Sequence, residues 1–107
     1  MSFIQIMQLQ TSKIDEIRAA VDRWQKATDG KATVTRSVIS QDRDKPNRYW
    51  VIVSFDSYED AMKNSSLPET DSLSKETIDL ADGPPVFFNL DVIEERLVGD
   101  RRPGTHD

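Results

Sequence analysis

Cysteine is absent from this sequence of 107 residues, and histidine occurs once, as His106. Without cysteine the chain has no disulfide framework, no thiol nucleophile and no thiolate metal site. A single histidine excludes a three-histidine metal centre, and a Ser-His-Asp triad would need the end of the chain to fold back. We therefore expect no bound metal.

An excess of positive charge and long apolar runs are also missing. The chain has 14 Lys and Arg against 19 Asp and Glu, a formal net charge of −5. Nonspecific affinity for nucleic acids comes mainly from basic side chains, so we expect no nucleic-acid partner. Nothing approaches transmembrane length, and the first residues lack the pattern of a signal peptide, so we expect a cytoplasmic protein without a membrane partner.

What the sequence does contain is an ordered series of strand and helix patterns. Apolar residues at steps of three and four, including Ile17, Val21 and Trp24, predict an amphipathic helix that starts near Ser12 and ends at Gly30. A second helical region is broken around Pro68, which suits the first turn of a renewed helix. Four stretches are typical of strands, at residues 2–9, 31–41, 48–55 and 86–93.

The order of these elements is βαββαβ, which predicts an α+β ferredoxin-like antiparallel sheet with both crossover helices on one face. We expect one domain over residues 1–98 and a flexible C-terminal tail over residues 99–107. The RNA-recognition motif shares this order. However, the strand at residues 48–55 lacks its glycines and has Ile52 where a stacking aromatic is expected.

Both faces of the predicted sheet carry large apolar side chains. One alternating set is expected to form the core under the helices: Tyr49, Val51, Val53, Phe55, Val86, Phe88, Leu90 and Val92. The opposite set contains Trp50, Ile52, Ser54, Phe87, Asn89, Asp91 and Ile93. An uncovered antiparallel face is normally polar, so a second copy of the chain, a ligand, or both should cover this one.

The element order, the broken second helix at residues 64–70 and the closing run at residues 82–92 resemble the dimeric α+β barrel superfamily. The resemblance is to its antibiotic biosynthesis monooxygenase-like proteins and covers residues 1–97. It implies a homodimer that packs sheet against sheet, with a pocket between sheet and helices or near the interface. The superfamily includes cofactor-free oxygenases of polycyclic aromatics, haem-degrading enzymes and many members without known activity.

Six residues are the candidates for a site of that kind. Asp91 is the candidate base, because desolvation would raise its pKa, and Asn89 and Arg36 are candidates for steadying an anion. Trp50 and Phe87 could stack on an aromatic ring, and Trp24 could wall a pocket. The competing interpretation is structural: Asn89 and Asp91 would satisfy backbone groups or pair across a dimer, and Trp24 would pack in the core.

The related haem enzymes place a histidine ligand in the second helical region, and this chain has none from Tyr58 to Ala81. We therefore expect no haem and no other cofactor. Two hypotheses remain open. The chain is either a cofactor-independent monooxygenase-like enzyme acting on an aromatic or polyketide-like molecule, or a noncatalytic dimeric module that binds a small ligand or only itself.

Overall fold

The computed structural model describes residues 1–99. Four antiparallel strands form one sheet in the order β2-β3-β1-β4, and three helices accompany it. The strands and helices, in chain order, are β1 (Phe3–Gln10), α1 (Ile14–Ala27), β2 (Val34–Gln41), β3 (Arg48–Phe55), α2 (Tyr58–Ser65), α3 (Pro68–Leu80) and β4 (Val86–Asp91). The predicted ferredoxin-like α+β fold is confirmed.

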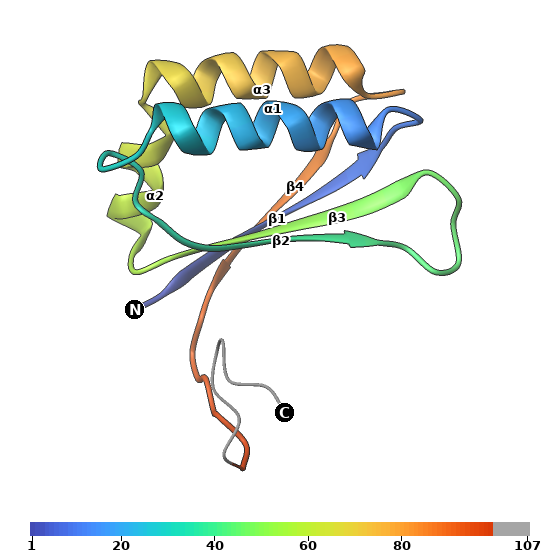
Figure 1. Cartoon of the computed structure of the whole chain (residues 1–107). Helices are drawn as coiled ribbons and strands as arrows, with labels where there is room; N and C mark the ends of the chain where they lie inside the picture. Colours follow the sequence, from blue (N-terminus) through green and yellow to red (C-terminus); the bar gives the residue numbers. More distant parts are fainter. Residues whose placement is uncertain (100–107) are drawn as a thin grey trace.

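All three helices lie on one side of the sheet. Helices α1 and α3 run side by side over it, and the shorter α2 lies at one end (Figure 1). The break between α2 and α3 follows from local sequence: Ser57 accepts a hydrogen bond from the Asp60 N–H at the start of α2, and Pro68 occupies the first turn of α3. Helix α1 begins one residue later than predicted, after Lys13 rather than Ser12.

Strand pairing defines which side chains share a face, because directly paired residues of antiparallel strands point the same way. Met7 pairs with Val51 and with Phe87, and Gln5 pairs with Val53 and with Asn89. These residues face the helices, and we call this face the helix side. The alternate residues form the open side, where Ile6 pairs with Ile52 and with Phe88.

The predicted alternation is correct for β3 and wrong by one residue for β4. Val51, Val53 and Phe55 face the helices as expected. On β4, Phe87 and Asn89 face the helices, whereas Val86, Phe88 and Leu90 lie on the open side and are 43–48% exposed. Four of the first five residues of β4 are apolar, so apolarity alone could not choose its inward face.

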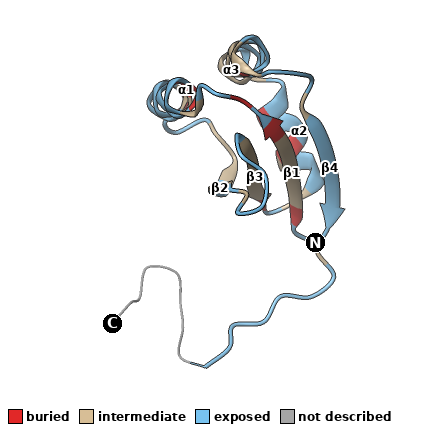
Figure 2. Ribbon diagram, turned by 90° about the vertical axis from the view of Figure 1, so that its right-hand side faces the viewer, coloured by how far each residue is buried: buried red, intermediate tan, exposed pale blue. Residues whose placement is uncertain are grey.

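The tightly packed core is small and divided between the two ends of the sheet. Phe3 and Phe55 pack with Ala61 of α2 at one end, and their rings lie 6.3 Å apart. Leu9, near the opposite end of β1, is fully buried. In Figure 2 buried residues lie at both ends of β1, on α2 and on α1, whereas β4 is exposed throughout.

Residues 92–99 continue from β4 and lead away from the sheet (Figure 1). The Val92 N–H still donates to the Ser2 carbonyl at 2.9 Å, but Ile93 is 92% exposed and Val98 is 76% exposed. The predicted tail at residues 99–107 lies outside the described residues, apart from Gly99. Within residues 1–99, no helix combines the length and apolarity needed to cross a membrane.

Candidate functional site

A cavity of about 540 Å³ lies between the helix side of the sheet and the helices. Pockets of this size commonly hold small-molecule ligands. All four strands contribute to the floor, and all three helices contribute to the walls and roof. The space exists because α1 and α3 pack against each other above the middle of the sheet, while the closest packing is at its ends (Figure 1).

Two neighbouring rows of paired side chains form most of the floor. The first, which we call the polar row, is Ser37, Val53, Gln5 and Asn89. Its two amides meet, because Gln5 Nε2 donates to Asn89 Oδ1 at 3.0 Å. The second, which we call the apolar row, is Ile39, Val51, Met7 and Phe87.

The roof combines an apolar face of α1 with a face of α3 that is rich in small hydroxyl residues. Ile17, Val21 and Trp24 project from α1, at the helical spacing that the sequence indicates. On α3, Thr70, Leu73 and Thr77 line the cavity. Small side chains along α3 leave volume between this helix and the sheet. These Thr and Ser residues are also the reason why the sequence of α3 shows only a weak apolar pattern.

Asn64, in the last turn of α2, is the most deeply buried amide of the cavity lining. Its side chain lines the cavity, the residue is 7% exposed, and Oδ1 has no hydrogen-bond partner among the described residues. A buried acceptor without a partner costs about 1–3 kcal/mol. The χ2 torsion of asparagine is soft, so a small rotation would present this amide to a ligand donor or acceptor.

Charge is nearly absent from the cavity. Asp71 is the one ionisable residue among the described residues that line it, and its side chain is 64% exposed and pairs with Lys75 at 3.1 Å. Within residues 1–99, no three side chains of His, Asp or Glu come together as a metal site. A ligand in this cavity would therefore meet apolar groups, amides and hydroxyls.

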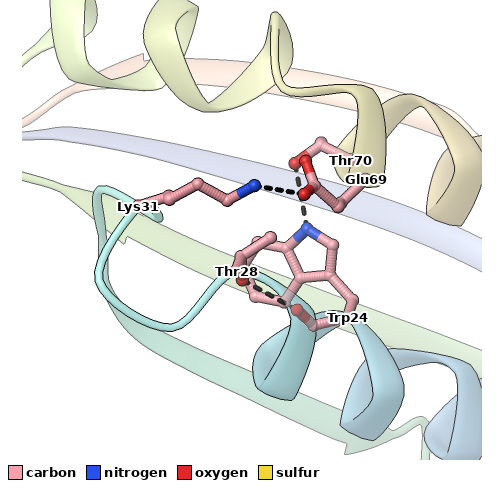
Figure 3. Close-up of polar contacts among 5 residues, drawn as sticks. All are labelled: Trp24, Thr28, Lys31, Glu69 and Thr70. Atoms are coloured by element: carbon pink, nitrogen blue, oxygen red, sulfur yellow. Dashed lines mark hydrogen bonds and ion pairs between the residues drawn. The ribbon is translucent and has the colours of Figure 1, made fainter.

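A cluster of polar contacts ties α1 to α3 at the end of the cavity nearest α2 (Figure 3). Trp24 Nε1 donates to Thr70 Oγ1 at 2.9 Å, and Lys31 forms an ion pair with Glu69. Lys31 lowers the pKa of the Glu69 carboxyl. The Trp24 indole N–H is therefore occupied, and the ring is held as a wall of the cavity rather than as a free donor.

The open side has a different character. Trp50 lies on it beside Phe88, with ring centroids 6.4 Å apart, and its indole N–H donates to Asp42 Oδ2 at 2.9 Å. This hydrogen bond, with a second from the Asp44 backbone N–H, lowers the pKa of Asp42. Ile4, Ile6, Val38 and Ile52 lie on the same face. No helix covers these residues within the described part of the chain.

The six residues singled out in the sequence fall in different places. Asn89, Phe87 and Trp24 line the cavity together. Trp50 and Arg36 lie on the open side, and Arg36 pairs with Ser54 there. Asp91 faces the helix side next to Phe3, is exposed, and does not line the cavity. The structure therefore does not bring Arg36 and Trp50 together with Asn89, and Asp91, although it shares the face of Asn89, lies outside the cavity lining.

Sequence reasoning missed Asn64. It is the penultimate residue of α2 and precedes the break at Pro68 by four positions. A polar residue at the end of a helix is normally solvated. The sequence contains one indication that Asn64 is buried: it lies three residues after Ala61, so both residues lie on one face of α2.

Comparison with known proteins supports the fold at low sequence identity. No family model and no curated protein sequence matches the chain. A protein from Caulobacter crescentus CB15, named for the antibiotic biosynthesis monooxygenases, superposes with a TM-score of 0.75 at 12% identity. The match covers 87% of this chain and 91% of that one.

Two further solved structures agree. SnoaB, a cofactor-independent oxygenase from Streptomyces nogalater solved as a single-site variant, gives a TM-score of 0.74 at 12% identity over 88% of this chain and 95% of that one. A protein from Chloroflexus aurantiacus J-10-fl is also named for the antibiotic biosynthesis monooxygenases. It superposes with a TM-score of 0.71 at 16% identity, and the match covers 92% of this chain and 100% of that one. The chain therefore has the ferredoxin-like α+β fold of the antibiotic biosynthesis monooxygenase proteins.

Proposed function

We propose that the protein is a small cofactor-independent monooxygenase that acts on an aromatic or polyketide-like molecule held between its sheet and its helices. The fold is shared with proteins named as monooxygenases, including one oxygenase described as cofactor-independent. A shared fold does not fix a function, so the proposal depends on the cavity.

The observation that carries the proposal is a mostly apolar cavity with a few amide and hydroxyl groups, one of which is a buried amide with an unpartnered oxygen, Asn64. Ligand sites typically have this composition, with apolar walls for affinity and a few polar groups for orientation. Leaving Asn64 Oδ1 unpaired destabilises the folded protein, and a ligand hydroxyl that donated to this oxygen would remove that cost.

The proposed reaction needs neither a metal nor a redox cofactor. Removal of one proton from an activated ring carbon of anthrone gives a carbanion, which reacts with dioxygen. Loss of water from the resulting hydroperoxide gives anthraquinone, so that anthrone and one O₂ become anthraquinone and one H₂O. Amide N–H groups of Asn64, Gln5 and Asn89 are the available donors for the negative oxygen that develops on the ring.

The proton needs an acceptor, and Asp71 is the one carboxylate among the described residues that line the cavity; Glu69, beside it, is paired with Lys31. Asp71 lines the cavity at a solvent-exposed position, whereas Asp91, the base that the sequence suggested, lies outside the lining. Asp71 is therefore the better-placed acceptor, directly or through water.

We also propose that the protein is a homodimer formed through the open side. Val86, Phe88 and Leu90 are each close to half exposed there, beside Trp50 and Ile52. Full burial of a large apolar side chain stabilises by about 1.5–3 kcal/mol, so a second sheet packed on this face would be favoured. The exposed residues 93–99, with Ile93, Leu97 and Val98, lead away from β4 and would be the segment that contacts the partner.

The test is oxygen consumption and anthraquinone formation with anthrone in air, measured against a blank without protein. We expect turnover, and we expect Asn64→Leu to lower kcat by about 100-fold, which is typical for loss of one donor to a developing oxyanion. Gln25→Leu is the matched control, because it removes an exposed amide on α1 outside the cavity. Turnover that is absent in the wild type, or equal in both variants, would contradict the proposal.

A second function, noncatalytic binding of a small ligand, is favoured by one observation. The only ionisable residue among the described lining residues, Asp71, is exposed and already paired with Lys75, so no free carboxylate faces the described cavity lining. Ligand binding without any oxygen consumption would select this function over the enzymatic one.

A further inference from the structure

We infer that the cavity selects neutral aromatic ligands that carry a hydroxyl or carbonyl group on one edge, that it discriminates against carboxylates, and that it holds the oxygenated edge toward α2. This inference rests on the proposed function in placing the ligand in the cavity. It adds the charge class of the ligand, its orientation and the residues that determine both.

The orientation follows from the order of the side-chain rows across the floor. Along β1, the row at Phe3 lies against Ala61 of α2, the polar row at Gln5 comes next, and the apolar row at Met7 follows. Of the two main rows of the floor, the polar row is the nearer to α2, and the apolar side chains of Val34 and Phe55 line the cavity beyond it. A flat ligand that spans both rows meets amides along one edge and hydrocarbon along the other.

Helix α2 adds its own amide at the same end. Asn64 follows Ala61 by three residues, which places the two on one face of the helix. Ala61 packs on Phe3 and Phe55, so this face of α2 is turned toward the sheet. The unpartnered amide of Asn64 and the Gln5–Asn89 pair thus lie at the end of the cavity where α2 meets the sheet.

Three other polar groups of the lining are already engaged. The Thr77 hydroxyl donates to the Leu73 carbonyl at 2.8 Å, the Ser65 hydroxyl donates to the Ala61 carbonyl at 3.1 Å, and the Trp24 indole N–H donates to Thr70. The three amides at the α2 end therefore supply most of the hydrogen-bonding capacity left for a ligand, together with the hydroxyls of Ser37 in the polar row and Ser74 on α3. The roof over the apolar row offers mainly apolar surface.

The charge preference follows from the absence of a cation. No Lys, Arg or His is among the described residues that line the cavity, and the one ionisable residue there is the acidic Asp71. A carboxylate that entered would lose its hydration without gaining an ion pair, which is costly in an apolar environment. A neutral hydroxyl pairs with an amide at no such cost.

The test is equilibrium dialysis at pH 7 with three probes of similar shape: 1-naphthol, 1-methylnaphthalene and 1-naphthoate. We expect 1-naphthol to bind at least about 10-fold more tightly than 1-naphthoate. We expect Asn64→Leu and Gln5→Met each to weaken 1-naphthol binding by about 10-fold, the usual effect of losing one hydrogen bond, while the affinity for 1-methylnaphthalene stays equal or rises. Gln8→Met is the matched control, because Gln8 lies on the same strand and points to the open side.

Equal or tighter binding of 1-naphthoate would overturn the charge preference. Unchanged 1-naphthol affinity in both amide variants would overturn the orientation. Thermal melting checks that each variant is folded, and Gln5→Met keeps the test intact if Asn64→Leu is not. The outcome is separable from turnover: the predicted binding pattern without anthrone oxidation would end the proposed enzymatic function alone, and anthrone oxidation without the pattern would end this inference alone.

Discussion

The two faces of the sheet differ in their surroundings: the helix side borders a cavity, and the open side is an uncovered apolar surface. On the helix side, the helices stand over a cavity of about 540 Å³ whose floor carries a row of amide and hydroxyl groups. On the open side, Trp50, Ile52, Phe88 and Leu90 form an apolar surface without a covering helix among the described residues. The first surface suits a small ligand, and the second suits a flat protein partner.

The difference teaches that burial alone does not identify the functional face. Half-exposed aromatic residues occur on both sides, with Phe87 at 49% and Phe88 at 43%. What separates the two sides is the distribution of polar groups. Gln5 and Asn89 are hydrogen-bonded to each other inside a concave space, whereas the Trp50 N–H is hydrogen-bonded to Asp42 at the edge of a flat one.

The largest effect is expected from a charge on the open side. Trp50→Arg should weaken the dimer by at least about 100-fold, because a buried charge without a partner costs roughly 3 kcal/mol or more. Size-exclusion chromatography with light scattering across a dilution series measures the change. Leu90→Arg should act in the same way without removing a hydrogen bond, because Leu90 is 45% exposed in the single chain.

Gln25→Arg is the control for this comparison, because it adds the same charge on the exposed outer side of α1. It should leave the mass in solution unchanged. A wild-type protein that is monomeric at high concentration, or Trp50 and Leu90 variants that remain dimeric, would contradict the assignment of the open side as an interface.

A smaller effect is expected from the Asp42–Trp50 hydrogen bond. Donation by the Trp50 indole holds the pKa of the Asp42 carboxyl below its ordinary value of 3.8. Since the folded state lowers this pKa, the carboxylate stabilises the fold at pH values above 3.8, and that contribution is lost as the pH falls toward the folded-state pKa. Asp42→Asn should therefore lower Tm by a few degrees at most at pH 7, with the difference shrinking below pH 3.8.

Asp44→Asn is the matched control, since it removes the same charge from the same turn while the Asp44 backbone N–H still donates to Asp42. A difference in Tm between Asp42→Asn and wild type that stays constant from pH 7 to about pH 3 would contradict the assigned cause.

Much of the fold could be predicted from the sequence, because its determinants are local. The apolar spacing of α1, the Ser57 cap and Pro68 each specify an element on their own, and the βαββαβ order then restricts the topology. The inward face of β4 could not be predicted, because both its odd-numbered and its even-numbered positions carry apolar residues. Only the pairing with β1 decides which set faces the helices.

The candidate site was less accessible from sequence. Asn89, Phe87 and Trp24 were named and do line the cavity. Trp50 was grouped with them through the misplaced face of β4, Arg36 lies on the open side, and Asp91 shares the face of Asn89 but lies outside the lining. Asn64 was missed because its burial depends on how α2 packs against the sheet, which is a tertiary property. The composition of this site therefore depends more on which face of each strand points inward, and on how the helices pack, than on residue type.

The two tryptophans allow one measurement to test both sides at once, because each indole N–H gives its own signal in a ¹H–¹⁵N NMR spectrum. Trp24 lines the cavity and Trp50 lies on the open side. We predict that titration with 1-naphthol shifts the Trp24 indole signal and leaves that of Trp50 in place, whereas dilution of the protein shifts Trp50 alone. A ligand that shifts Trp50 instead, or a Trp24 signal that follows protein concentration, would contradict the assignment of a ligand site to the helix side and a partner to the open side.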